Sequence, residues 1–160
     1  MAKWIAQRRV SLSLAALMLA LAFVTGSLLR GPRLALRPKV GTGIDAFNDT
    51  HNYFSPITSV VFASSLFELL IAIAALVVLV GAAERLMGWW RTLLAFVVTA
   101  YAGAAVGMLL QAAGLLAREI WAVRIEELIV FDPFTAISGT LLTASAFAGP
   151  LWRRRVRVLG

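Results

Sequence analysis

The sequence predicts an all-α membrane protein: a polytopic bundle of about four transmembrane helices with a long first external loop. Of its 160 residues 61% are hydrophobic and only 14% charged, and its mean hydropathy is +0.87. A water-soluble domain of this size could not bury so much apolar surface. A helix needs roughly 20 apolar residues to cross the hydrocarbon core. Such runs predict spans at about 10–29, 57–83, 92–117 and 133–152.

The composition also excludes several kinds of chemistry. There is no cysteine, which removes disulfides, thiolate metal sites and cysteine nucleophiles, and His51 is the one histidine. The adjacent Glu126 and Glu127 point to different helix faces, so no metal site is expected. No glycine-rich phosphate loop occurs, and we expect no cofactor. The net charge of +7 comes from Lys and Arg that flank apolar runs, which indicates a lipid bilayer rather than a nucleic acid as partner.

The first predicted span follows a basic tail at residues 1–9. Signal-peptide cores run about 7–15 apolar residues and end at a small-residue cleavage site. The run 10–29 is longer and continues into the basic Arg30–Arg33, which favours a retained helix. Gly, Pro, Asn and Asp are frequent in residues 30–56, which predicts a long external loop.

The second and third spans are joined by a short turn. Pro56 suits a helix start, and the span 57–83 is apolar except for Ser, Thr and Glu68. Trp89 and Trp90 lie in the turn, where aromatic residues typically mark the membrane interface. The span 92–117 contains Gly103-x-x-x-Gly107, a pattern that lets another helix approach closely.

The last part combines an interfacial segment with a fourth span. Residues 118–131 mix charges with Ile, Trp and Leu, which predicts an amphipathic segment at the outer surface. The span 133–152 ends in a basic tail at 153–160. Nine Lys and Arg lie on one side of the predicted spans and six on the other, so both termini are predicted to be cytoplasmic.

Glu68 is the first candidate site residue. It lies about 12 residues into the second predicted span, on the order of 18 Å from the outer end. A charged carboxylate there costs roughly 3 kcal/mol, so it should face the bundle and is a candidate binding residue. The simpler interpretation is a protonated Glu68 that hydrogen-bonds to Ser or Thr of a neighbouring helix.

Ser138 is the second candidate, as a catalytic nucleophile in Ala136-Ile137-Ser138-Gly139. A serine needs a base, and the one histidine is His51 in the first external loop, with no matching acid at a recognisable spacing. Taken by themselves, these residues favour a packing contact for Ser138 and an exposed loop position for His51.

The second span and its flanks resemble the rhomboid intramembrane proteases. Thr58 matches the threonine after the family's first external loop, Glu84 and Gly88 match its Glu-x-x-x-Gly turn, and Ser138-Gly139 resembles its nucleophile motif. The family's two second-helix histidines correspond to Ala63 and Glu68, its asparagine to Ala72, and its Trp-Arg pair to Phe54-Ser55. The resemblance implies lost oxyanion donors, and one such donor is typically worth about 100- to 1000-fold in rate. In the family the catalytic histidine belongs to a sixth helix, beyond the four spans predicted here.

The resemblance therefore implies a degenerate, non-catalytic rhomboid-like module in a bacterial inner membrane. Similar regions precede cytoplasmic lipid-aminoacylating domains in some actinobacterial proteins, which implies a lipid, a membrane-protein partner or a further domain after Gly160. Two alternatives stay open. One is a serine intramembrane protease that uses Ser138, and the other is a small proton or ion transporter that uses Glu68.

Overall fold

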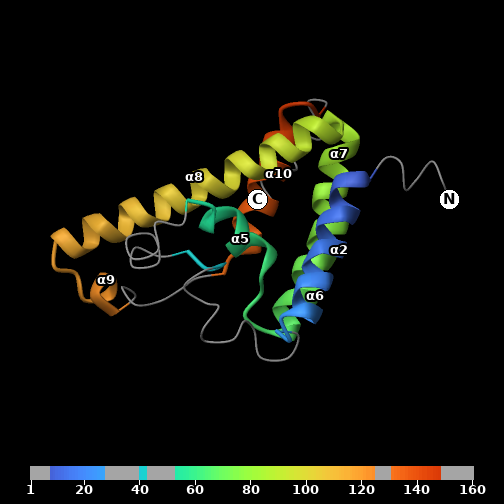
Figure 1. The fold of residues 1–160 in the computed structure, drawn as a ribbon. Coiled ribbons are helices and arrows are strands. Elements are labelled where there is room, and N and C mark those ends of the chain that lie inside the picture. The colour runs from blue at the N-terminus through green and yellow to red at the C-terminus, as the bar shows by residue number, and fades with distance from the viewer. Residues whose placement is uncertain (1–7, 28–39, 43–52, 125–130, 149–160) are drawn as a thin grey trace.

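The computed structural model describes residues 8–27, 40–42, 53–124 and 131–148, and every regular element within them is a helix. A first helix runs antiparallel to a long helical column, a second long helix leaves the column obliquely, and a shorter helix crosses that one (Figure 1). The first helix is α2 (Arg9–Val24), the column is α6 (Leu66–Ala75), η1 (Leu76–Val80) and α7 (Gly81–Met87), the oblique helix is α8 (Trp89–Leu116), and the crossing helix is α10 (Pro133–Ser145). Two short helices, α5 (Ser55–Val61) and α9 (Ile120–Arg124), pack against α8.

The stretch predicted as a single span over 57–83 forms two helices in the structure. α5 ends at Val61, Phe62 is extended with φ −109° and ψ 151°, and α6 begins at Leu66. Ser65 is extended and caps α6 by accepting a hydrogen bond from the Glu68 backbone N–H at 3.2 Å. A serine followed three residues later by glutamate favours a new helix start over a continued helix.

Two stretches of the described chain are long and apolar enough to cross a membrane, by length and composition. They are the column Leu66–Met87, with 22 residues, and α8, with 28 residues. They meet at Gly88, whose φ of +84° places it in a region that disfavours residues with a side chain. α8 begins three residues before the predicted span 92–117 and ends one residue short of it.

The first and fourth predicted spans appear as shorter helices. α2 has 16 residues and α10 has 13, and Asp132 caps α10 by accepting hydrogen bonds from the N–H groups of Phe134 and Thr135. Pro56 lies in the first turn of α5, as predicted. The tails 1–7 and 149–160, most of the predicted loop 30–56, and residues 125–130 of the predicted interfacial segment lie outside the described residues.

The end of α8 is a tight reversal that brings α9 back onto it. Arg118 has φ +57°, and the N–H groups of Arg118 and Glu119 donate to the carbonyls of Leu115 and Gly114. This is the Schellman arrangement, with arginine where glycine is usual. Gly114 makes the packing possible, because a Cβ there would lie 2.6 Å from the Trp121 ring.

The core lies where α2, α6, η1, α8 and α10 meet. Met18 of α2, Leu76 of η1 and Ile137 of α10 are each 1% exposed, and the rings of Phe62 and Phe131 lie 6.4 Å apart beside them. The core is narrow, because large apolar side chains on the outer faces of α6 and α8 stay exposed, including Phe67, Leu70, Leu109 and Leu110.

Candidate functional site

The Ser138 hydroxyl is engaged by its own helix. It donates to the Phe134 carbonyl at 2.8 Å and lies 3.3 Å from the Thr135 carbonyl, and the side chain is half-buried. This is the ordinary back-bonding of a serine within a helix. His51, the one histidine that could act as its base, lies outside the described residues.

Gly139, the neighbour of Ser138, makes the close contact between α8 and α10. A Cβ at Gly139 would lie 2.6 Å from Thr99 Cβ, and the Thr99 hydroxyl lies 3.3 Å from the Ala136 carbonyl across the interface. A glycine in this place lets the two backbones approach, as small residues do between membrane helices. The Ser-Gly pair therefore sits at a helix-packing contact.

The same interface contains a second glycine contact, in which α8 supplies the glycine and α10 supplies the threonine. Gly103 of α8 faces the Thr135 methyl group of α10, with no room for a Cβ between them. Thr99 and Gly103 on one helix thus oppose Gly139 and Thr135 on the other, each pair four residues apart. The close approach predicted from Gly103-x-x-x-Gly107 is present at Gly103, whereas a Cβ added at Gly107 would meet nothing within 4 Å.

Glu68 lies in the first turn of α6 rather than deep within a span. Its Oε2 accepts a hydrogen bond from the Ser64 backbone N–H at 2.8 Å, while Ser65 caps the Glu68 N–H. The predicted depth of about 18 Å assumed one continuous helix from residue 57, whereas α6 begins at Leu66. A carboxylate near a helix N-terminus is stabilised by the partial positive charge there.

Glu84 is the buried carboxylate of the described chain, and sequence reasoning gave it no such role. It is 4% exposed, and its two oxygens accept hydrogen bonds from the Val10 N–H at 3.0 and 3.1 Å and from the Ser11 N–H at 3.2 Å. Glu84 of α7 therefore caps α2, a helix more than 70 residues earlier in the chain. Its place in the Glu84-x-x-x-Gly88 pattern was the signal that could have marked it.

Arg8 makes a second link between the same two helices. Its guanidinium donates to the Val77 carbonyl at 2.9 Å and packs over Gly81, where a Cβ would lie 3.3 Å from Nη1. Val77 belongs to η1, a π-helical stretch in which the regular α-helical hydrogen bonds are interrupted. Arg8 and Glu84 together fix the start of α2 against the column.

Thr58, another residue on which the family resemblance rests, links Val40 to α5. Its hydroxyl lies 3.0 Å from the Val40 carbonyl and 3.1 Å from the Ser55 carbonyl of its own helix. Ala63 and Ala72, at two positions where the resemblance places polar residues, are buried in the core at 7% and 0% exposure.

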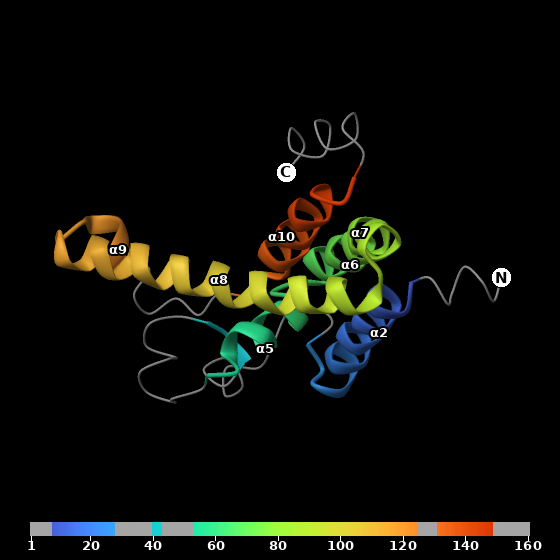
Figure 2. The ribbon, with the colours of Figure 1, turned by 90° about the horizontal axis from the view of Figure 1, so that it is seen from above.

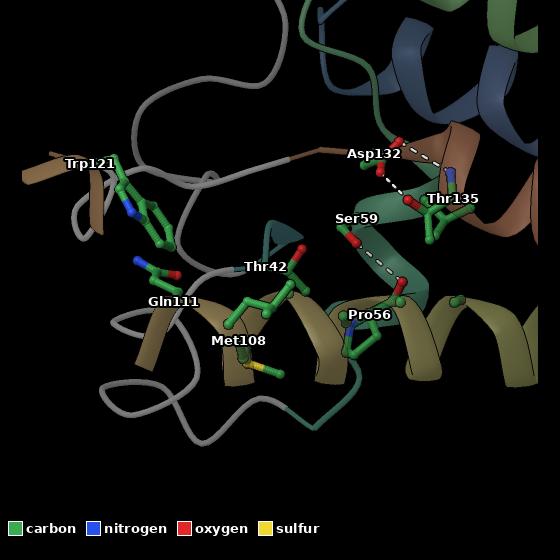
Figure 3. Close-up of a pocket in the computed structure, with 14 residues that line it drawn as sticks. Thr42, Pro56, Ser59, Met108, Gln111, Trp121, Asp132 and Thr135 are labelled. Carbon is green, nitrogen blue, oxygen red and sulfur yellow. Dashed lines mark hydrogen bonds between the residues drawn. The ribbon is translucent and has the colours of Figure 1, made fainter. Parts of the chain in front are cut away.

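A cavity of about 430 Å³ lies beside the interface of α8 and α10, between α5, α8, α9 and the start of α10 (Figure 3). Gly103, Gly107 and Met108 of α8 form one wall, and Pro56 and Ser59 of α5 face them. The Ser59 hydroxyl donates to the Pro56 carbonyl, and the Thr135 hydroxyl donates to the Asp132 carboxylate. These polar groups are thus satisfied within the protein.

Charged residues are distributed unequally between the two ends of the bundle. At one end of the bundle α2 begins, α7 meets α8, and α10 ends. We call this the basic end. Arg8, Arg9, Arg85 and Arg91 lie there, and Arg91 lies over the Phe147 ring at 5.5 Å, which joins α10 to this end. Trp89 and Trp90 pack edge to face beside them, with ring centroids 5.6 Å apart.

The described residues contain no group of three His, Asp or Glu side chains that could hold a metal ion. Glu126 and Glu127 lie outside this part of the chain. No protein-family model, curated protein or solved structure matches the chain.

Proposed function

We propose that the chain is a non-catalytic, rhomboid-like membrane module that anchors or scaffolds and binds lipid or a membrane partner. The observation that carries the proposal is the exposure of its apolar helices. Only 33% of the most apolar window of Leu66–Met87 and 17% of that of Trp89–Leu116 are buried. The core helix of a water-soluble protein would be mostly buried, so these faces need an apolar surrounding.

The helix lengths support this membrane assignment. At about 1.5 Å per residue the 22-residue column is about 33 Å long, close to the roughly 30 Å hydrocarbon core. α8 would be about 42 Å long, and a helix longer than the hydrocarbon core can span it by tilting. α2 and α10 correspond to the first and the fourth of the proposed spans.

The charge distribution supports an orientation with the basic end in the cytoplasm. Four arginines and two tryptophans lie at that end, and cytoplasmic flanks of membrane helices are enriched in Lys and Arg. The opposite end, where α6 begins, carries Ser64, Ser65 and Glu68.

The roles of the candidate residues favour a scaffold over a protease. The Ser138 hydroxyl is directed to the carbonyls of its own helix, and Gly139 serves helix packing. The Glu68 carboxylate accepts a hydrogen bond from the Ser64 N–H just before α6, which gives it a structural role without a transported ion.

Cysteine labelling tests the membrane assignment, because the chain contains no cysteine of its own. We expect Ser64→Cys to react with a membrane-impermeant maleimide on intact spheroplasts, and Leu86→Cys to react only after permeabilisation. Both positions are exposed on the protein, so the bilayer determines the difference. Recovery of the protein in the soluble fraction would refute the membrane assignment, and the reverse labelling pattern would refute the orientation.

A fluorophosphonate probe tests the absence of catalysis. We expect no labelling of the purified full-length protein in detergent, with a rhomboid protease reacting in parallel as the control. Labelling that is lost in Ser138→Ala would show an activated serine and would establish the protease alternative.

A further inference from the structure

We propose that a groove between the first turns of α2 and α8 binds the headgroup and upper acyl chain of one anionic phospholipid. The inference rests on the proposed function, because it needs this end of the bundle to lie at a membrane surface. The groove has a volume of about 340 Å³ and is lined by Arg9, Val10, Ser13, Leu14, Trp89 and Leu93. The two helices contact each other at the basic end (Figure 2).

Arg9 supplies the charge. Its side chain is exposed and has no hydrogen-bond or ion-pair partner among the described residues. Arg8 next to it is directed elsewhere, to the Val77 carbonyl of the column. The guanidinium of Arg9 is therefore available for a phosphate group, which it can bind through two parallel hydrogen bonds.

No carboxylate of the described chain compensates this charge. The nearest one at the basic end is Glu84, which is buried and directed to the N–H groups of Val10 and Ser11. Glu68 lies in the first turn of α6, Glu119 follows the end of α8, and Asp132 precedes α10, all away from the basic end. Arg85 and Arg91, both exposed, add to the positive potential around the groove, which makes it complementary to an anion.

The remaining lining residues fit the upper part of a lipid. Trp89 is 55% exposed and carries an apolar ring with a polar N–H, the residue type that prefers the headgroup level. Leu14 and Leu93 extend the groove with apolar side chains along the two helices. A cation, an interfacial aromatic ring and an apolar wall together select a molecule with a phosphate joined to a hydrocarbon chain. A free phosphate ion would use only the first of the three.

Native mass spectrometry of the full chain in detergent tests the proposal, with phosphatidylglycerol as the anionic probe and phosphatidylcholine as the neutral one. One arginine at a membrane surface contributes about 1 kcal/mol to anionic lipid binding, about a fivefold change in affinity. We expect Arg9→Gln to weaken phosphatidylglycerol binding about fivefold. The matched control is Arg85→Gln, which removes the same charge at the same end from outside the groove and should weaken binding clearly less than Arg9→Gln does.

Three results would overturn the proposal. Equal losses in Arg9→Gln and Arg85→Gln would mean a diffuse charge effect and no groove. Equal binding of phosphatidylcholine would remove the role of the anionic headgroup, and full competition by inorganic phosphate would indicate an ion site. Insertion is measured separately by the Ser64→Cys and Leu86→Cys labelling, so failure of the groove with normal insertion leaves the membrane assignment standing.

Discussion

Replacing Glu84 with alanine should detach the start of α2 from the helical column. The carboxylate accepts from two backbone N–H groups, and the residues that carry them, Val10 and Ser11, are 6% and 0% exposed. Water cannot readily replace the lost acceptor there. A buried donor left without a partner costs about 1–3 kcal/mol, so two of them give about 2–6 kcal/mol before relaxation. We expect a loss of about 3 kcal/mol for Glu84→Ala, and about half of that for Glu84→Gln, which keeps one acceptor oxygen.

The free energy of unfolding can be measured by titrating the protein from detergent micelles into sodium dodecyl sulfate, with helicity as the signal. The matched control is Glu119→Ala, since Glu119 is exposed and its side chain lies at the far end of α8. This variant should stay within about 0.5 kcal/mol of the wild type. If Glu84→Ala is no more destabilised than Glu119→Ala, the carboxylate does not hold α2.

The remaining predictions concern glycine contacts and a turn. Gly139→Ala should cost about 1–3 kcal/mol in the same titration, because its Cβ meets Thr99, whereas Gly107→Ala, with open space, should be neutral or stabilising. Equal effects of the two would contradict the packing contact between α8 and α10. Arg118→Gly should raise stability by about 0.5–1 kcal/mol because it relieves a positive φ, whereas Arg118→Ala should not. A gain with alanine would place the effect in the arginine side chain instead.

The sequence predicted the helices better than their interruptions. The long apolar run predicted the start of α8 to within three residues, because hydropathy depends only on local residues. The break between α5 and α6 was missed, although Ser65 and Glu68 carry a local capping signal, because the apolar run continues across it. A hydropathy scale measures how readily side chains transfer from water into lipid. It therefore does not detect where the backbone leaves the helical conformation.

The candidate site could be predicted less well because its contacts join distant parts of the chain. The bond from Glu84 to Val10 spans 74 residues, and no local pattern specifies which helix start a carboxylate will cap. The depth predicted for Glu68 depended on where its helix was assumed to begin. Because the break before α6 was missed, Glu68 was predicted in the interior of a span, whereas it lies near a helix start. Ser138 could be interpreted as a packing residue because it lacked a base at a recognisable spacing.

Three residues on which the proposed family resemblance rests have a role in helix placement in the structure. Thr58 donates to the Val40 carbonyl, Glu84 caps a distant helix, and Gly88 turns the chain with a positive φ, so each acts on the backbone. Ala63 and Ala72, where the resemblance implies polar chemistry, lie buried among apolar neighbours. Our proposal of a non-catalytic module draws on these contacts, because each of them positions a backbone segment.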